Sequence, residues 1–241
     1  ELAEKRINEL LKENKMIFLV GGSAFYLRAL IKGMYESQEI DVKLKLDTND
    51  EYEKKGIGFI VQYLKENDPE MLINLHENDH YRLTRAYYHH KTTGQAISLE
   101  KNRMDKINPY DLSQDIKQNW NIHHIYLNIP KEEHYQIIEN RTKNMIKNGL
   151  IREVRELLEN GFTGKEKPLQ SIAYKEVLEF LSSNQNSTIS TEQELIERIF
   201  ISTRQFAKSQ RTFFKKIAPK TEYHPLKDQK KIQNEFLTFL K

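Results

Sequence analysis

The sequence predicts an α/β fold, and three features of the chain support that prediction. Residues 1–32 alternate between an amphipathic helical pattern, a short apolar run at 16–20 and a second helical pattern from 24. A second apolar run, residues 120–129, has the character of a strand and stops at Pro130. Most of the remaining chain has helical spacing of its apolar residues. Helices that alternate with strands are typical of a parallel sheet covered by helices.

A pair of glycines follows the first predicted strand. Gly21 and Gly22 stop the apolar residues 16–20 abruptly, which favours a short buried strand over part of a helix. Ser23 then stands where the N-cap of the helix over 24–32 is expected. Glycines at the carboxyl end of a parallel strand let a ligand approach the backbone, and the helix that follows directs N–H groups to the same place. The pair therefore makes this turn a candidate ligand site, although two glycines between a strand and a helix are more often plain turn geometry.

The character of the chain changes near residue 35. Residues 36–53 are polar with weak periodicity, and the apolar residues in 59–75 suggest short helices. The clearest helix there is 79–90, which Thr92-Thr93-Gly94 closes, and Pro109 marks a return to the first domain. We therefore divide the chain into residues 1–34 and 113–241, the two parts of a core domain, and 35–112, a helical insertion.

The second part of the predicted core is mainly helical. Glycines at 149 and 161 stand where helix terminators are expected. The predicted elements are a helix pair over 131–148 and 150–161, a further segment over 168–181, a long helix over 190–217, an edge strand at 223–224 and a closing helix over 229–240.

Composition limits the class of protein. The 241 residues carry a formal net charge of only +3 with 30% charged residues, so an anionic partner must be met by local clusters of charge. The absence of cysteine excludes disulfides and cysteine zinc sites. No apolar run approaches the ~20 residues of a membrane span, and no signal peptide is visible. We expect a cytoplasmic protein without a membrane partner.

The strongest cluster of charge lies in the long helix. Residues 198–216 contain six basic residues and no acidic one. Helical spacing places four of them on one face, and these residues form the cationic stripe: Arg204, Lys208, Arg211 and Lys215. Phe206, Phe213 and Ile217 fall on the opposite side and are predicted to pack in the core. A solvated face would normally mix charge signs, so the stripe favours contact with an anion or a nucleic acid.

Three further arginines are candidates for phosphate contact. Arg82 and Arg85 are three residues apart on one helical face, and either they clamp phosphates or they pair with neighbouring acidic residues. Arg141 lies in a helix after the second strand, where a cation could neutralise a leaving phosphate. The histidine pairs 89–90 and 123–124 lack a ligand at metal-binding spacing and are predicted to be structural or exposed. No Ser-His-Asp arrangement and no G-x-x-x-x-G-K-[ST] loop is present.

Five segments in order resemble the tRNA dimethylallyltransferases, the isopentenyl-tRNA transferase family. They are VGGSAFYLRAL from Val20, NDHYRLTRAYY with the later TTGQAIS, RTKNMIKNGLIREV from Arg141, QSIAYKE from Gln170, and TRQFAKSQRTFFKK from Thr203. The family's patterns are V-G-G-T-G-x-Y-x-x-A-L, N-D-x-x-R-x-x-R-A-L, R-v-d-x-M-x-x-x-G-L-x-x-E-V, Q-S-I-G-Y-K-E and T-R-Q-x-A-K-R-Q-x-T-W-F-R. The resemblance covers nearly the whole chain.

The resemblance implies transfer of the dimethylallyl group of dimethylallyl diphosphate to N6 of the adenosine at position 37 of tRNA. It also implies a fold like that of the P-loop kinases, a parallel sheet flanked by helices with a helical insertion that grips the anticodon stem-loop. In the family an N-terminal P-loop holds the diphosphate with Mg²⁺, and an aspartate is the general base. Neither motif is in this sequence, so no metal ligand and no base is assigned here. We expect that an N-terminal segment is missing, that residues 1–241 alone do not transfer the group, and that the protein is a monomer.

The resemblance also implies functional residues. Ser23 stands at the family's threonine beside the flipped base, Lys45 at a basic contact, and Arg141 at the leaving diphosphate. With Arg204 added from the cationic stripe, the implied tRNA contacts are Ser23, Lys45, Tyr81, Arg82, Leu83, Thr84, Arg85, Gln170, Ser171, Ile172, Ala173, Tyr174, Lys175, Arg204, Lys208, Gln210, Arg211, Thr212, Phe213, Phe214 and Lys215. The departures from the family's pattern are Ser23 for threonine, Ala24 and Ala173 for glycine, Ser209 for arginine and Phe213 for tryptophan. Two alternatives stay open: a non-catalytic RNA-binding protein, and a prenyltransferase that acts on free adenylate.

Overall fold

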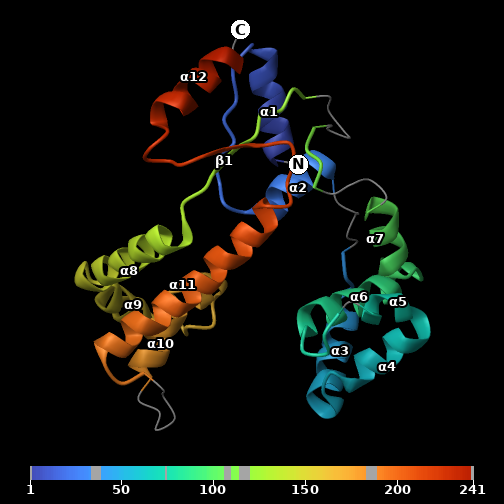
Figure 1. Cartoon of the computed structure of the whole chain (residues 1–241). Helices are drawn as coiled ribbons and strands as arrows, with labels where there is room; N and C mark the ends of the chain where they lie inside the picture. The colour runs from blue at the N-terminus through green and yellow to red at the C-terminus, as the bar shows by residue number, and fades with distance from the viewer. Residues whose placement is uncertain are drawn as a thin grey trace. The chain divides into compact units, whose positions relative to one another are not determined.

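Helices make up most of the described chain (Figure 1). The computed structural model describes residues 2–33, 39–73, 75–105, 110–113, 120–182 and 189–239. The chain divides into two compact units, one of residues 1–19 with 25–120 and one of residues 20–24 with 121–241. The predicted boundary at 34–35 and the predicted return at Pro109 lie outside the described residues. The assignment of 1–34 and 113–241 to one core domain stays a prediction.

The first unit contains the helices that the sequence places in the amino-terminal half. They are α1 (Leu2–Lys12), α2 (Ala24–Lys32), α3 (Val42–Lys55), α4 (Gly58–Asn67), α5 (Pro69–Ile73), α6 (His80–Thr93) and α7 (Ile97–Asp105). Helix α6 ends at Gly94, whose φ of 70° is the left-handed conformation of a helix terminator, as its sequence predicts. The sequence did not predict α3, because most of its side chains are exposed and its apolar residues show little helical periodicity. Local capping defines α3 instead, since the Asp41 side chain accepts a hydrogen bond from the Leu44 N–H at 3.1 Å.

The core of the first unit lies between α4 and α6. Ile60 and Leu64 of α4 pack with Leu83 and Ala86 of α6, and all four are fully buried. Asp68 is also buried, and its carboxylate accepts hydrogen bonds from the backbone N–H groups that begin α5 and α7, at Met71 (3.3 Å) and Ser98 (3.1 Å). These bonds satisfy a buried carboxylate that would otherwise be costly.

The second unit combines a small parallel sheet with helices. Strand β1 (Ile125–Leu127) pairs in parallel with β2 (Thr221–Tyr223), with Ile125 opposite Thr221. The helices are α8 (Lys131–Lys147), α9 (Leu150–Glu159), the 3₁₀ helix η1 (Lys167–Gln170), α10 (Tyr174–Leu181), α11 (Glu192–Phe214) and α12 (Gln229–Phe239). The helix pair α8–α9, the long helix α11, the closing helix and the late strand confirm the sequence predictions. The predicted second strand is real but shorter than residues 120–129.

The predicted strand over residues 16–20 is wrong. These residues form neither helix nor strand, and Phe18, Leu19 and Val20 are 58%, 57% and 91% exposed. A strand exists only through its ladder partners, and no described segment pairs with this one. The apolar character of residues 16–20 predicted a buried strand, but the described structure leaves these side chains largely exposed.

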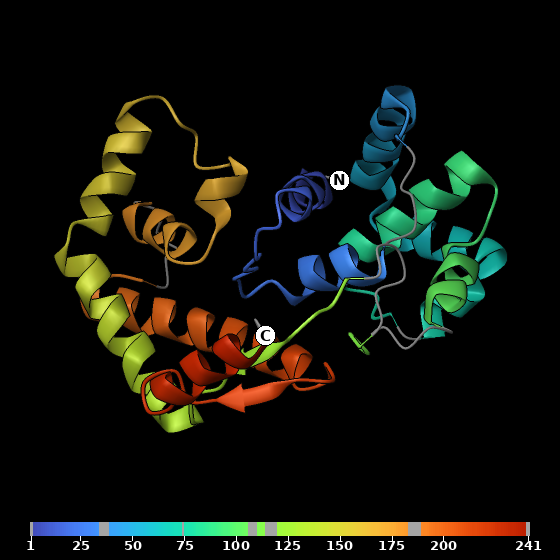
Figure 2. The same cartoon turned by 90° about the horizontal axis from the view of Figure 1, so that it is seen from above.

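Helix α11 packs on different partners along its length. Its first half buries Leu195 and Ile199 in a cluster with Val154 of α9 and Val177 of α10. In its second half Phe214 stacks on Tyr126 of β1, with ring centroids 5.8 Å apart, and the helix lies beside α8 (Figures 1 and 2). The face of α11 that is buried therefore changes along the helix. Ala207 and Phe214 are buried, whereas Phe206 is 53% exposed. The prediction that Phe206 packs in the core is therefore wrong.

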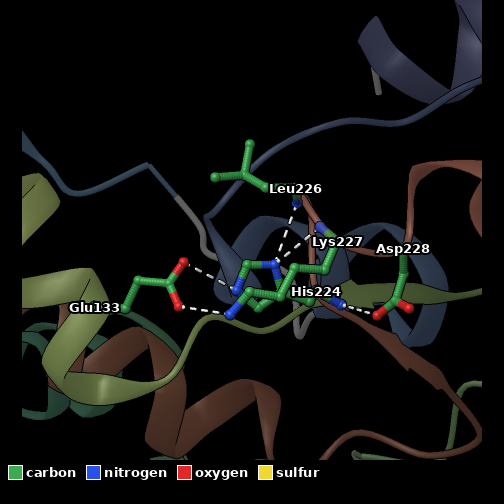
Figure 3. Close-up of polar contacts among 5 residues, drawn as sticks. All are labelled: Glu133, His224, Leu226, Lys227 and Asp228. Carbon is green, nitrogen blue, oxygen red and sulfur yellow. Dashed lines mark hydrogen bonds and ion pairs between the residues drawn. The ribbon is translucent and has the colours of Figure 1, made fainter.

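Polar contacts join the beginning of α8 to the segment after β2 (Figure 3). His224 Nδ1 accepts hydrogen bonds from the backbone N–H groups of Leu226 (3.3 Å) and Lys227 (3.2 Å), so the ring proton lies on Nε2. That Nε2 faces the Glu133 carboxylate at 3.1 Å, and the Lys227 ammonium pairs with the other carboxylate oxygen at 3.1 Å. Lys227, followed by His224, lowers the pKa of Glu133. The contacts fix α8 against the β2–α12 connection.

A capping box begins α11. The Thr191 hydroxyl accepts from the Glu194 N–H at 3.2 Å, and Glu194 Oε2 accepts from the Thr191 N–H at 3.0 Å. Ser190 donates two further bonds to the same oxygen, from its N–H at 2.8 Å and its hydroxyl at 2.7 Å. Hydrogen bonds to the carboxylate, those from Ser190 first and then that from Thr191, lower the pKa of Glu194 from 4.5 to about 2.

We expect Glu194→Gln to lower the melting temperature at pH 7. The folded pKa of Glu194 lies below its ordinary value of 4.5, so its stabilising effect is complete above that pH and disappears as the pH falls towards about 2. The melting-temperature difference between wild type and Glu194→Gln should therefore shrink over this interval. Glu192→Gln, in the same first turn, removes the same charge without the capping bonds and should cost less. Equal losses in the two variants would mean that the helix dipole alone acts here.

Candidate nucleic-acid interface

A hydrogen bond holds the glycine pair against α11. The Gln210 Nε2 donates to the backbone carbonyl of Gly22 at 2.9 Å, across 188 residues of sequence. A Cβ atom at Gly22 would lie only 2.5 Å from that nitrogen, so glycine permits this close approach. The bond lies within the second unit and brings the exposed Ser23 next to the carboxyl half of α11.

The cationic stripe of α11 consists of two kinds of side chain. Lys208 and Lys215 are exposed, and in the part of the chain that the structure describes neither forms an ion pair. Arg204 and Arg211 are half-buried against α8. The Arg204 guanidinium lies 4.7 Å from the ring centroid of Tyr135, an arrangement that favours a cation–π contact. The stripe therefore presents two lysines to solvent and uses two arginines for packing.

Arg211 contacts a histidine of α8. Its Nη2 lies 3.3 Å from His134 Nδ1. Burial, followed by the positive charge of Arg211, lowers the pKa of His134. The imidazole is therefore neutral near pH 7, and its Nδ1 can accept the guanidinium hydrogen. Sequence reasoning missed His134 and Tyr135, because only the packing of α8 on α11 gives them a role.

The predicted tRNA-contacting segment 170–175 has a strained backbone. Ala173 has φ 81° and ψ −49°, a conformation that non-glycine residues rarely adopt. Its N–H donates to Glu176 Oε2 at 2.7 Å, and the neighbouring Tyr174 hydroxyl donates to Glu153 of α9. The hydrogen bond to Glu153 is the first cause of a raised pKa of Tyr174. These bonds hold the loop so that Ser171, Ile172 and Lys175 remain exposed.

The predicted tRNA-contacting segment of α6, Tyr81–Arg85, belongs to the first unit. Tyr81 is 74% exposed, whereas Leu83 is fully buried in the core, so Leu83 can only support the segment. Arg82 forms an ion pair with Asp79, with its Nε 3.3 Å from Oδ2. This is the second of the two alternatives that the sequence left open, pairing with a neighbouring acidic residue. Thr84 and Arg85 are half-buried on another side of the helix.

Arg141 lies on α8 apart from the contact between Arg211 and His134. Arg141 is exposed on α8, and no described carboxylate forms an ion pair with it. It lies seven residues beyond His134, which is about 10 Å along a helix axis. Lys45 is likewise exposed on α3. No group of three metal-ligating side chains is found among the described residues.

The fold and these contacts define an α/β protein whose long helix carries exposed lysines and holds a glycine loop, as in enzymes that bind nucleic acids. A model of the IPP transferase family matches residues 1–217, and the chain belongs to that family.

The chain is also similar to curated tRNA dimethylallyltransferases. The chain is 32% identical over 244 residues to the tRNA dimethylallyltransferase of Clostridioides difficile, a match that covers 99% of this chain and 73% of the relative. It is 31% identical over 216 residues to tRNA dimethylallyltransferase 2 of Geotalea daltonii, covering 89% of this chain and 61% of the relative. The chain thus spans roughly two thirds of the length of these proteins.

Solved structures share the fold. One is a eukaryotic dimethylallyltransferase acting on tRNA, with a TM-score of 0.69 and 22% identity, which covers 98% of this chain and 60% of that one. Another is the full-length tRNA isopentenylpyrophosphate transferase of Bacillus halodurans, with a TM-score of 0.58 and 24% identity over 99% of this chain and 70% of that one. The α/β class and the resemblance to this family are thereby confirmed. Among the described helices none has the length and apolarity needed to cross a membrane.

We expect Ala173→Gly to cost little stability, because glycine relieves the strain of the positive φ. Ala207 is the matched control, since it is equally buried at 6% exposed but lies inside α11. Glycine at 207 loses a buried methyl group and helix propensity, together about 1.5–2 kcal/mol. Ala173 precedes α10, so only the buried methyl group is lost there, and relief of roughly 1–3 kcal/mol of strain offsets that loss. Denaturant unfolding should show Ala173→Gly to be clearly more stable than Ala207→Gly, and equal losses would contradict strain at Ala173.

Proposed function

We propose that this protein transfers the dimethylallyl group of dimethylallyl diphosphate to N6 of the adenosine at position 37 of tRNA. Membership of the IPP transferase family supports the reaction class. The observation that carries the proposal is the hydrogen bond between Gln210 and Gly22, which brings Ser23 to the helix that also carries the exposed Lys208. The carboxyl half of α11 thus holds the loop with a hydroxyl for the base and carries ammonium groups for the RNA backbone.

The chemistry makes clear what these residues must do. The N6 nitrogen attacks the first carbon of the dimethylallyl group, the C–O bond breaks, and diphosphate leaves with the bonding electrons while N6 loses a proton. A base in a stacked loop cannot reach the substrate, so it must be turned out of the stack. In this proposal Ser23 contacts the displaced base, and Lys208 and Lys215 hold phosphates of the distorted loop. Arg141 meets the charge that grows on the departing diphosphate.

The described residues do not form a ligand set for the metal that the family resemblance implies. No three described His, Asp or Glu side chains converge. No step of the proposed mechanism is therefore assigned to Mg²⁺, and no residue of this chain is assigned as the general base.

Three finer features belong to the same proposal. The RNA partner is the anticodon stem-loop, the protein acts as a monomer, and it works in the cytoplasm. The exposed lysines of α11 and the exposed tyrosine of α6 support an RNA partner with unstacked bases.

Deletion of the gene that encodes this chain tests the reaction. Mass spectrometry of tRNA digests should show that N6-dimethylallyladenosine disappears from position 37 and returns with the wild-type gene. Arg141→Gln should leave the melting temperature unchanged, since no described ion pair is lost, and lower the single-turnover rate of the purified gene product ~10²-fold. Modification that persists after deletion, together with RNA binding, would identify a non-catalytic RNA-binding protein. Transfer to free adenylate but not tRNA would identify the other alternative.

We expect tRNA binding to weaken with salt as phosphate contacts are replaced by counterions. Lys208→Ala and Lys215→Ala should each reduce the slope of log K against log salt by about one, for all tRNAs alike. Lys231→Ala is the control, because the Lys231 ammonium already pairs with Asp228 at 2.7 Å. Filter binding across a salt series measures the slopes, and equal slopes in all variants would leave the lysines as a solvated face.

A further inference from the structure

The two neighbours of Ser23 are held in place by different means. Gly22, before it, accepts the hydrogen bond from Gln210 Nε2 through its backbone carbonyl at 2.9 Å. Ala24, after it, is buried and begins α2. The Ser23 hydroxyl is exposed and has no hydrogen-bond partner in the described parts of the chain. The position of this hydroxyl therefore depends on how the backbone of its two neighbours is fixed.

Gln210 is placed to hold the glycine loop. It lies three residues after Ala207 and four before Phe214, and both of these are buried. Helical spacing therefore puts Gln210 on the packed side of α11, where its side chain is half-buried. Its amide nitrogen is already engaged by the Gly22 carbonyl in the absence of RNA. These observations favour a contact within the protein over a contact with RNA.

The close approach of Gln210, and not the backbone conformation, requires a glycine at position 22. Gly22 does not have a positive φ. A Cβ atom there would lie 2.5 Å from Gln210 Nε2, whereas a Cβ atom at Gly21 would meet no atom within 4 Å. The amide is the free end of a flexible side chain, so an alanine at 22 would push it away and break the hydrogen bond. Gly22→Ala and Gln210→Ala thus remove the same bond from its two ends.

We propose that Gln210 is a positioning residue, which through Gly22 holds Ser23 where its hydroxyl meets the displaced base, and that Gln210 does not contact RNA. The inference rests on the proposed function, in which Ser23 contacts that base. It gives Gln210 a different role from the tRNA contact that the family resemblance implies. A small misplacement of a contacting group slows the chemical step, while phosphate contacts made elsewhere keep the affinity for RNA. Loss of Gln210 should therefore lower the rate and leave binding unchanged.

Thermal unfolding of the free gene product tests the hydrogen bond. Gly21→Ala is the matched control in the loop, and Gln205→Ala, at an exposed glutamine, is the matched control in α11. Relative to these controls, Gly22→Ala and Gln210→Ala should lower the melting temperature by similar amounts. The double variant should lose no more than either single variant, because one bond is removed in all three. Losses that add would contradict a shared bond.

Single-turnover transfer of the dimethylallyl group to tRNA tests the positioning role. Ser23→Ala should lower the rate about 2- to 10-fold, the usual value of one neutral hydrogen bond, and Gln210→Ala by a similar factor. The double variant should be no slower than Ser23→Ala, because the hydroxyl that Gln210 positions is already gone. Gln210→Glu keeps the size of the side chain without the donor and should match Gln210→Ala. The tRNA dissociation constant and its salt slope should equal those of wild type in both Gln210 variants.

The outcomes separate this inference from the proposed function. If Gln210→Ala weakens tRNA binding and its rate loss multiplies with that of Ser23→Ala, Gln210 contacts RNA directly. The positioning role is then wrong and the proposed function stands. A normal rate in Gln210→Ala or Gln210→Glu has the same meaning for the positioning role. If the wild-type gene product transfers no dimethylallyl group to tRNA, both the proposed function and this inference are wrong.

Discussion

Helix α11 buries apolar side chains on one face and carries the cationic stripe on another. The packing of the second unit depends on how this one helix meets both requirements. Like charges spaced four residues apart destabilise a helix by a few tenths of a kcal/mol per pair. The stripe lies in the carboxyl half of α11, where the helix dipole favours cations. The arginines of the stripe also pack on α8, at Tyr135 and His134. Lys208 and Lys215 can then remain without carboxylate partners among the described residues, at a cost that packing offsets.

The same helix sets the position of the glycine loop. Gln210 belongs to the segment between the buried Ala207 and Phe214, so its side chain is directed by residues that cannot shift easily. Its amide then fixes the backbone of Gly22. A rigid helix therefore positions a loop whose own residues, Gly21 to Ser23, are exposed and have little packing of their own. The arrangement resembles other sites in which loops carry the chemistry and helices supply the rigidity.

The first unit uses α6 in a comparable way. One side of the helix is core and the other lines a groove between α3 and α6, and the residues of both sides come from the single stretch HYRLTRAYYHHKTT. Alternation of apolar and polar residues at helical spacing makes this division possible. The fully buried Leu83 therefore supports Tyr81, Thr84 and Arg85.

The sequence alone determined which segments become helices wherever apolar spacing and end signals agree. Gly94, Gly149 and Gly161 all adopt positive φ at or near helix ends, and α2 has the predicted bounds. Local signals work there because helical hydrogen bonds and caps involve residues close in sequence. Helix α3 was missed because its side chains are mostly exposed, and residues 16–20 were misjudged because a strand depends on distant partners. The motifs placed the candidate site on α11 and the glycine loop. Only the tertiary structure decided that Arg204 and Arg211 face α8, that Phe206 is exposed and that Gln210 holds Gly22, because each depends on how one helix is rotated against its neighbours.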